Sequence, residues 1–245
     1  MRRFFAALFA TPVLTLSVVF LLSSCRFLGG ERVSGDGHVV TRQRNIGSFN
    51  SLDVGGALEV RIRQDATASV RVETDENLQE YVETYLDGST LVIHNKQGYN
   101  LDPSKDIIIY VSAPEWKDLD VSGSSKLMGE NTLNANELGL HVSGASEMNL
   151  EVKTRKLETD MSGSSSIQLR GSAETASSEV SGASHLRCLD LQTNETTLEM
   201  SGASDAEVTA EKQLNVEASG ASHVRYRGNA NIDQKSSGAS SVEKM

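Results

Sequence analysis

Four acidic residues recur at a spacing that could bring their carboxylates together in the folded chain. Each stands two residues before a Ser-Gly dipeptide: Asp160, Glu179, Glu199 and Glu217. If each interval is one coil of a stacked structure, the carboxylates form a row with a spacing of about 5 Å. Like charges this close repel one another, and a calcium ion, which prefers oxygen ligands, would relieve that repulsion. A hydrated acidic surface without metal is the simpler interpretation, because the chain lacks the repeated calcium motif of RTX proteins.

A second row follows from the residues that stand four positions after the first serine of the same motif. There the sequence places His185, Asp205 and His223 in successive intervals. Two imidazoles around a carboxylate could bind zinc, although a column of ordinary exposed polar residues is the commoner arrangement. We therefore expect no metal and no other cofactor. If the row is functional, its histidines predict a pH dependence near about pH 6–7.

The serines of the motif are poor candidates for catalysis. A nucleophilic serine needs one dedicated base, whereas these serines occur in seven equivalent copies, none of them within a Gly-x-Ser-x-Gly motif. An enzyme acting on polysaccharides would need a distinctive set of carboxylates in one cleft. Here the carboxylates follow the repeat, and the chain has one tryptophan, Trp116. We expect a non-enzymatic protein.

The tetrapeptide Ser-Gly-Ala/Ser-Ser organises the second half of the chain. Its glycines are Gly123, Gly144, Gly163, Gly182, Gly202, Gly220 and Gly238. Intervals of 18 to 21 residues are typical of a solenoid, in which small coils stack because none can bury a core alone. Apolar residues alternate with polar ones on both sides of the motif, which indicates strands with one buried face. The predicted fold is all-β: a single-stranded, right-handed β-helix, or β-solenoid, with coils of about 20 residues.

The motif glycines are predicted to form the corner of each coil. Glycine permits a positive φ or a tight bend, and the small residues beside it allow corners to stack at the strand spacing of about 4.8 Å. Serine hydroxyls can satisfy backbone groups that the bend leaves without partners. Each coil then consists of a strand, the corner, a second strand and a loop.

Residues 45–115 lack the tetrapeptide but contain strand patterns such as "ALEVRI" (57–62). We interpret them as wider, irregular coils that lead into the regular coils of residues 116–245, and a separate small β-sandwich is the alternative. Residues 75–88 suit a short helix or an acidic strand. The last coil is more polar than the others, as expected of a cap, although end-to-end association into a homo-oligomer would also protect it.

The N-terminus has the features of a lipoprotein signal peptide. Two arginines precede an apolar stretch from Phe4 to Leu22, and two serines then precede Cys25. We expect a signal peptide over residues 1–24, a membrane anchor through lipid on Cys25, a linker over 25–44 and a β-solenoid domain over 45–245. A retained membrane helix is the alternative. Because arginine, and not aspartate, follows the cysteine, we expect an outer-membrane lipoprotein that faces either the periplasm or the outside.

The charge balance limits the classes of partner. The formal net charge is −10, and loss of residues 1–24 would remove two arginines and no acidic residue, which leaves −12. Nucleic acid is not expected as a partner, whereas a cation, a basic protein or a basic peptide suits this field. The other cysteine, Cys188, lies in an apolar column and is predicted to be a small buried hydrophobe. With Cys25 lipidated, no intramolecular disulfide can form.

Several segments carry a resemblance to a known family: "FNSLDVGGALEVRI" (49–62), "LVIHN" (91–95), "IIIYVSAPEWKDLDVSGSSKL" (107–127) and the recurring "SGAS". In these features the chain resembles the head GIN domain family of auto-transporter adhesins, which are secreted or lipid-anchored proteins of Bacteroidetes-type bacteria. The resemblance covers residues 45–240, nearly all of the mature domain. It implies an all-β solenoid with an adhesin role, and it supplies no catalytic residues. This chain departs from the family's auto-transporter description in having its own lipobox.

The sequence thus favours a cell-envelope lipoprotein that presents a rigid β-solenoid surface for adhesion or for binding a protein or glycan ligand. A structural or sensory envelope component that binds a protein partner is the alternative. A β-helix enzyme acting on polysaccharides is a weaker one.

Overall fold

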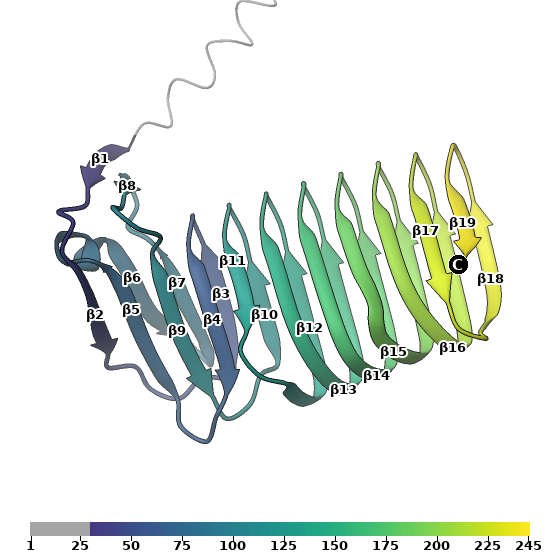
Figure 1. Ribbon diagram of the computed structural model, residues 1–245, viewed down its shortest axis with the longest axis horizontal. Coiled ribbons are helices and arrows are strands. Elements are labelled where there is room, and N and C mark those ends of the chain that lie inside the picture. The colour runs from purple at the N-terminus through teal and green to yellow at the C-terminus, as the bar shows by residue number, and fades with distance from the viewer. Residues whose placement is uncertain (1–29) are drawn as a thin grey trace, which may run out of the picture.

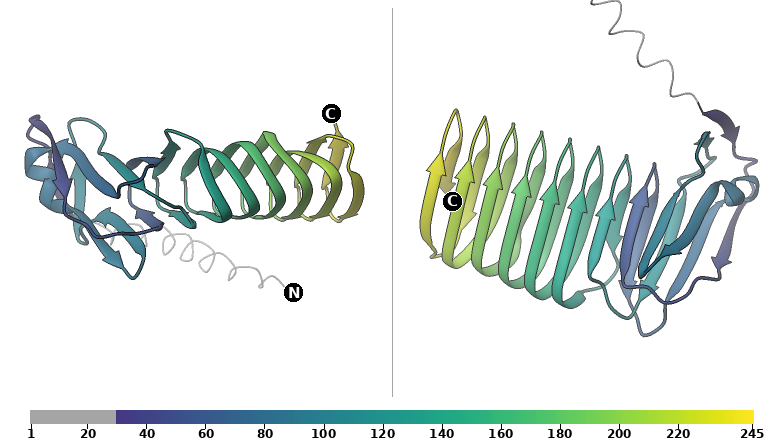
Figure 2. Two further views of the ribbon diagram at one scale, coloured as in Figure 1. Left: turned by 90° about the horizontal axis from the view of Figure 1, so that it is seen from below. Right: turned by 180° about the vertical axis from the view of Figure 1, so that it is seen from behind.

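The computed structural model describes residues 30–245 (Figure 1). The predicted signal peptide and Cys25 lie outside the described residues. Nearly all described elements are strands, which confirms the predicted β-solenoid, and Figure 2 shows the coils stacked along one axis. No helix within residues 30–245 is long and apolar enough to cross a membrane.

The first part of the described chain consists of short strands and a 3-10 helix. Its elements are β1 (Glu31–Ser34), β2 (Val39–Arg44), β3 (Ser51–Gly55), β4 (Glu59–Gln64), β5 (Ser69–Asp75), η2 (Glu76–Tyr81), β6 (Val82–Asp87), β7 (Thr90–Asn95), β8 (Tyr99–Asp102) and β9 (Ile108–Ala113). The second part contains β10 (Asp118–Val121), β11 (Lys126–Gly129), β12 (Leu133–Val142), β13 (Glu147–Met161), β14 (Ser166–Val180), β15 (His185–Met200), β16 (Asp205–Ala218), β17 (His223–Arg227), β18 (Asn231–Ser236) and β19 (Ser241–Lys244).

In each regular coil the chain enters a corner along one face of the solenoid and leaves it along the opposite face. We call these the upstream face and the downstream face; the corners lie along the upper edge in Figure 1. Strands β13 to β16 are 14 to 16 residues long and run down the downstream face, round the lower edge and up the upstream face. Neighbouring coils pair in parallel register, as Asp160 does with Glu179.

In the coils of β13 to β16, a bend within a continuous strand replaces the loop that the sequence predicted, whereas residues outside strands join β11 to β12 and β17 to β18. Gly171 has a φ of +111°, and the register between β15 and β16 shifts between Cys188 and Gln192. A glycine or a bulge can bend a strand without ending it, because most neighbouring residues keep their ladder hydrogen bonds.

Apolar side chains from both faces meet in one core that runs along the stack. The columns predicted to point inward are buried, as Met161 and Val180 are on the upstream face and Met148 and Ile167 on the downstream face. Cys188 is 5% exposed, which confirms the prediction of a small buried hydrophobe. Burial raises the pKa of its thiol to about 12, so the thiol stays protonated and unreactive at neutral pH.

The seven motif glycines all lie at the corners, with φ between 73° and 80°. At each corner the N–H of the residue after glycine donates to the glycine carbonyl of the preceding coil, as Ala183 does to Gly163 at 2.8 Å. A Cβ on Gly182 would lie 2.3 Å from that same carbonyl oxygen. Glycine therefore satisfies both the backbone angle and the close approach, whereas any other residue would violate both.

The last serine of each corner faces the interior. Six of these serines are at most 2% exposed: Ser125, Ser146, Ser165, Ser184, Ser204 and Ser222. The hydroxyl of Ser184 donates to the carbonyl of Ser181 at 2.8 Å, and Ser222 donates to Ser219 at 2.9 Å. The hydroxyls of Ser184 and Ser222 thus close their turns by giving a partner to a backbone acceptor, as the sequence predicted.

The first half of the chain adds coils in an order that differs from the sequence order. Strand β3 lies between β7 and β10, and β4 lies between β9 and β11. Residues 51–64 are therefore a regular coil inserted between two later segments of the chain. Its corner is Gly56, with a φ of +118°, and the N–H of Ser124 donates to the Gly56 carbonyl at 2.7 Å. The prediction of wider coils missed this insertion, because local strand patterns do not specify which distant strands pair.

An antiparallel layer closes the N-terminal end of the stack. Strand β5 pairs with β9, β2 with β5, and β6 with β7, all antiparallel. Strands β1 and β2 lie within residues 25–44, so the predicted linker is wrong for this part of the chain. All six residues of β2 pair with β5, which explains why the segment is a strand.

Residues 75–88 were predicted to form a short helix or an acidic strand, and both occur: the 3-10 helix η2 is followed by strand β6.

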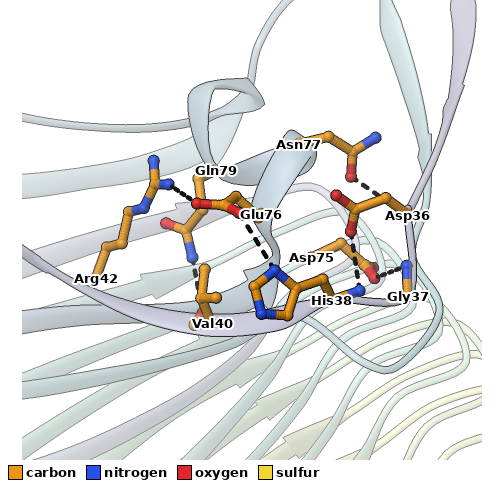
Figure 3. A network of polar contacts seen from close by, with 9 residues as sticks. All are labelled: Asp36, Gly37, His38, Val40, Arg42, Asp75, Glu76, Asn77 and Gln79. Atoms are coloured by element: carbon orange, nitrogen blue, oxygen red, sulfur yellow. Dashed lines mark hydrogen bonds and ion pairs between the residues drawn. The ribbon is translucent and has the colours of Figure 1, made fainter.

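A network of polar contacts fixes this layer (Figure 3). Asp75 is fully buried and accepts hydrogen bonds from the N–H of Gly37 at 2.8 Å and from the N–H and hydroxyl of Ser104 at 2.8 and 2.6 Å. Gln79, which is 2% exposed, donates to backbone carbonyls of β2 and β5. Burial alone would raise the pKa of Asp75, but the hydrogen bonds from Ser104 and Gly37 outweigh it and hold that pKa below its ordinary value.

The variant Gly182→Ala tests the corner. Alanine would have to adopt a positive φ with its Cβ against the Gly163 carbonyl, so we expect the free energy of unfolding to fall by about 2–3 kcal/mol. Gly88→Ala is the matched control, because Gly88 has a φ of +61° but no atom within 4 Å of where its Cβ would lie. We expect a loss of about 1 kcal/mol there. Urea unfolding followed by circular dichroism measures both losses, and equal losses would contradict the role of close stacking.

The Asp75 network should make a pH-dependent contribution to stability. A carboxyl whose pKa is lowered by folding stabilises the fold above its ordinary pKa, and this contribution is lost as the pH falls through the lowered value. We expect Asp75→Asn to reduce the free energy of unfolding at pH 7 by about 1.5–3 kcal/mol, and the difference to shrink below about pH 4. Denaturant unfolding at pH 7 and pH 3 provides the measurement. Asp87→Asn removes the same charge from an exposed position and controls for net charge; a loss that does not change with pH would refute the explanation.

Candidate binding groove

The predicted acidic row is a continuous row on the upstream face. In spatial order it consists of Asp53, Asp120, His141, Asp160, Glu179, Glu199, Glu217 and Lys235. Strand alternation places these side chains on one face, because each occupies the same position before a corner. The structure thus brings together the four carboxylates that the sequence singled out. It also adds Asp53, which was missed because β3 is not followed by the tetrapeptide.

This row and the corners beside it line an open groove of about 690 Å³, which we call the acidic groove. Its lining runs from Asp120 to Lys235 and includes the first serine of each corner from Ser143 onward. The hydroxyls of Ser181 and Ser219 donate to backbone carbonyls of the preceding coil at 3.1 and 3.2 Å. The groove is therefore a rigid surface on which one charge follows another at the strand spacing of about 4.8 Å.

Basic side chains lie towards the ends of the groove. Nδ1 of His141 is 3.0 Å from the Asp160 carboxylate, and Nζ of Lys235 is 2.5 Å from the Glu217 carboxylate. Within residues 30–245 no ion pair involves the two glutamates between them, Glu179 and Glu199. The central carboxylates are thus accessible to a cationic ligand.

Near the first end of the row, Asp120 lies where its ionised form is disfavoured. Burial, followed by the charge of neighbouring Asp53, raises the pKa of Asp120 above its ordinary value, and His141 partly opposes this shift. A cation bound near this end would favour the ionised form of Asp120 and would relieve the repulsion.

The row considered for zinc lies on the downstream face. Nε2 of His185 and Nδ1 of His223 are 3.5 and 3.7 Å from the carboxylate of Asp205, which stands between them in register. In the described part of the chain, no group of three or more His, Cys, Asp or Glu residues is arranged to hold a metal ion. The row of His185, Asp205 and His223 is therefore not such a group, and neither is the acidic row on the upstream face. The spacing of the histidines and Asp205 has a simpler consequence. It allows ion pairs between coils when the histidines are protonated.

The fold and the groove define a structural class: a β-solenoid whose polar side chains form periodic rows on two flat faces. Residues 48–230 match the family described as "Putative auto-transporter adhesin, head GIN domain". The chain therefore belongs to the head GIN domain family. No curated protein matches the chain.

Several solved structures share the fold. A structure described as a "putative adhesin" from Bacteroides fragilis has a TM-score of 0.82 at 17% identity and covers 87% of this chain and 100% of its own. A "putative adhesin" from Parabacteroides merdae has a TM-score of 0.72 at 24% identity, with 88% and 99% covered. A "putative lipid binding protein" from Parabacteroides distasonis has a TM-score of 0.71 at 22% identity, with 88% and 100% covered. At these identities the likeness shows the fold alone.

Proposed function

We propose that this protein is a non-enzymatic, lipid-anchored component of the cell envelope that uses the acidic groove to bind a basic polypeptide. The acidic groove is the main support for this proposal. It presents carboxylates at a fixed spacing over successive coils, and the central pair, Glu179 and Glu199, has no ion-pair partner among the described residues.

The groove suits an extended basic chain. Alternate side chains of an extended peptide point the same way at intervals of about 6.6–6.8 Å, and long lysine or arginine side chains can adjust to carboxylates about 4.8 Å apart. Corner serines beside the row supply further hydrogen-bonding groups. The net charge of −10 would also attract a basic ligand over longer distances at low salt.

Family membership supports a binding role at the cell envelope. The family and two of the similar structures carry the word adhesin in their descriptions. One similar structure is described as lipid binding. A peptide is the better ligand here, because the acidic groove is lined by charges and hydroxyls, which favour a basic polar chain over an acyl chain.

The uniformity of the row favours binding over catalysis. Acid–base catalysis requires two groups whose environments push their pKa values apart. In the acidic groove, the coils from Asp160 to Glu217 repeat one carboxylate beside the first serine of each corner, a pattern that suits a uniform binding surface better than one dedicated acid–base pair.

Binding of fluorescein-labelled octalysine, followed by fluorescence anisotropy, tests the groove. We expect saturable binding that weakens as NaCl is raised. The variant Glu179→Gln/Glu199→Gln/Glu217→Gln should lose about tenfold in affinity, if three exposed ion pairs contribute about 0.5 kcal/mol each.

The matched control removes the same number of charges from the downstream face. Glu147→Gln/Glu207→Gln/Glu243→Gln changes the net charge equally, and these residues lie in the downstream parts of β13 and β16 and in β19. We expect it to bind octalysine nearly as well as the parent chain. Equal losses in the two variants would mean that general charge, and not the groove, attracts the peptide.

A fractionation experiment tests the anchor and the facing of the domain. We expect Cys25→Ser to move the protein from the membrane fraction to the soluble fraction, because the acyl chains would be lost. Protease treatment of intact cells, compared with lysed cells and a periplasmic control protein, then reports the facing. Cleavage on intact cells agrees with adhesion, whereas protection until lysis would exclude it and favour a partner within the periplasm.

A further inference from the structure

A second cleft opens where the repeat is interrupted. The interval from Gly123 to Gly144 is 21 residues, compared with 18 to 20 in the later coils. Strand β11 ends at Gly129, and the chain then crosses to β12, which begins at Leu133, at the lower edge of the stack (Figure 1). Beside this crossing lies a cleft of about 700 Å³, lined by residues 115–118 and 134–139 together with Lys156 and Glu158, and none of its lining residues belongs to the acidic groove.

A missing side chain creates part of this cleft. Gly139 lies between Asp118 and Glu158 in register, and it is not among the glycines with positive φ. The backbone therefore does not require glycine here. A Cβ at this position would lie 2.6 Å from Oδ1 of Asp118, whose other oxygen accepts a hydrogen bond from Ser51 at 3.4 Å. Glycine thus leaves room for the Asp118 carboxylate. It also leaves a gap between the side chains of Asp118 and Glu158, which flank it on the neighbouring strands.

One residue holds both walls of the cleft in place. The amide of Gln64 donates to the carbonyls of Pro114 and Asn134 at 2.9 and 3.1 Å, and its Oε1 accepts from the N–H of Asn134 at 2.7 Å. The side chain of Asn131 bonds both backbone groups of Gln64 at 2.9 Å. A cleft fixed in this way before a ligand arrives loses little conformational entropy on binding.

The cleft offers both donors and acceptors. Its lining includes the carboxylates of Glu115, Asp118, Glu137 and Glu158, the ammonium groups of Lys117 and Lys156, and the amide of Asn136. Lys156 and Glu158 form an ion pair at 2.5 Å, so they present a donor and an acceptor side by side. Oδ1 of Asn136 accepts from Arg155 at 2.9 Å, which orients the amide. Within residues 30–245 no hydrogen bond uses the Nδ2 donors of Asn136. The acidic groove, in contrast, offers mainly acceptors.

We infer that this cleft binds a neutral sugar or amino-sugar unit of a glycan. Vicinal sugar hydroxyls donate to carboxylates and accept from ammonium and amide groups, so they use both kinds of partner that the cleft presents. Its volume lies within the range of about 300–1,000 Å³ that is usual for small-molecule sites. Acidic sugars fit less well, because carboxylates outnumber lysines in the lining. This inference does not depend on peptide binding in the acidic groove.

The sole tryptophan provides a reporter. Trp116 lines the cleft, is 2% exposed, and donates its indole N–H to the Arg63 carbonyl at 3.3 Å. Mannotriose, chitotriose and the trimer of glucosamine are the probes, titrated into the intact protein while Trp116 fluorescence and saturation-transfer NMR are recorded. We expect a saturable response to at least one probe. The absence of a saturable response to all three would overturn the inference.

Two exposed residues identify the site. Asp118→Ala and Lys117→Ala should each weaken binding of the responsive sugar about tenfold, the effect of losing about 1.4 kcal/mol of hydrogen bonding. Circular dichroism checks that both variants fold, and the triple glutamine variant of the downstream face should bind sugar as the parent chain does. Unchanged sugar binding in both Asp118→Ala and Lys117→Ala would overturn the assignment. Octalysine titrations run in parallel report the acidic groove separately, so the two proposals can fail independently.

Discussion

The structure depends on the hydrogen bond that each corner makes to the glycine carbonyl of the preceding coil. That contact requires a positive φ and leaves no room for a Cβ, with the preceding carbonyl oxygen 2.3 to 2.6 Å from where it would lie at the seven motif corners. It fixes neighbouring coils in register at the upper edge. Once the corners are aligned, strand alternation determines which side chains enter the core and which form rows outside.

The surface chemistry follows from this alignment. Because each column repeats at the strand spacing, a single preference at one position, such as an acid before the corner, becomes a row of charges. The acidic groove is the result where the column stays uniform from Asp160 to Glu217. The cleft beside Gly139 lies where another outward column, formed by Asp118, Gly139 and Glu158, lacks a side chain at its middle position. The acidic groove therefore presents mainly carboxylates, whereas the cleft beside Gly139 presents both carboxylates and ammonium groups.

Much of the second half could be predicted from the sequence. The inward columns, the corner glycines, the buried Cys188 and the row from Asp160 to Glu217 all depend on local periodicity, which a sequence shows directly. The insertion of β3 and β4 between later coils depends on pairing between distant segments, so periodicity could not reveal it. The clamp by Gln64 also joins residues far apart in sequence, and nothing in the local pattern around it signals a contact with Asn134.

Mapping where a basic peptide lies on the solenoid tests binding in the acidic groove directly. Carbodiimide joins lysine amines to carboxylates in contact with them, so octalysine treated with it on the protein should be linked to the carboxylates that bind it. Mass spectrometry of the digested product identifies the linked residues. We expect links at Glu179, Glu199 and Glu217 on the upstream face. Links mainly at Glu147, Glu207 and Glu243, or spread evenly over both faces, would contradict binding in the acidic groove.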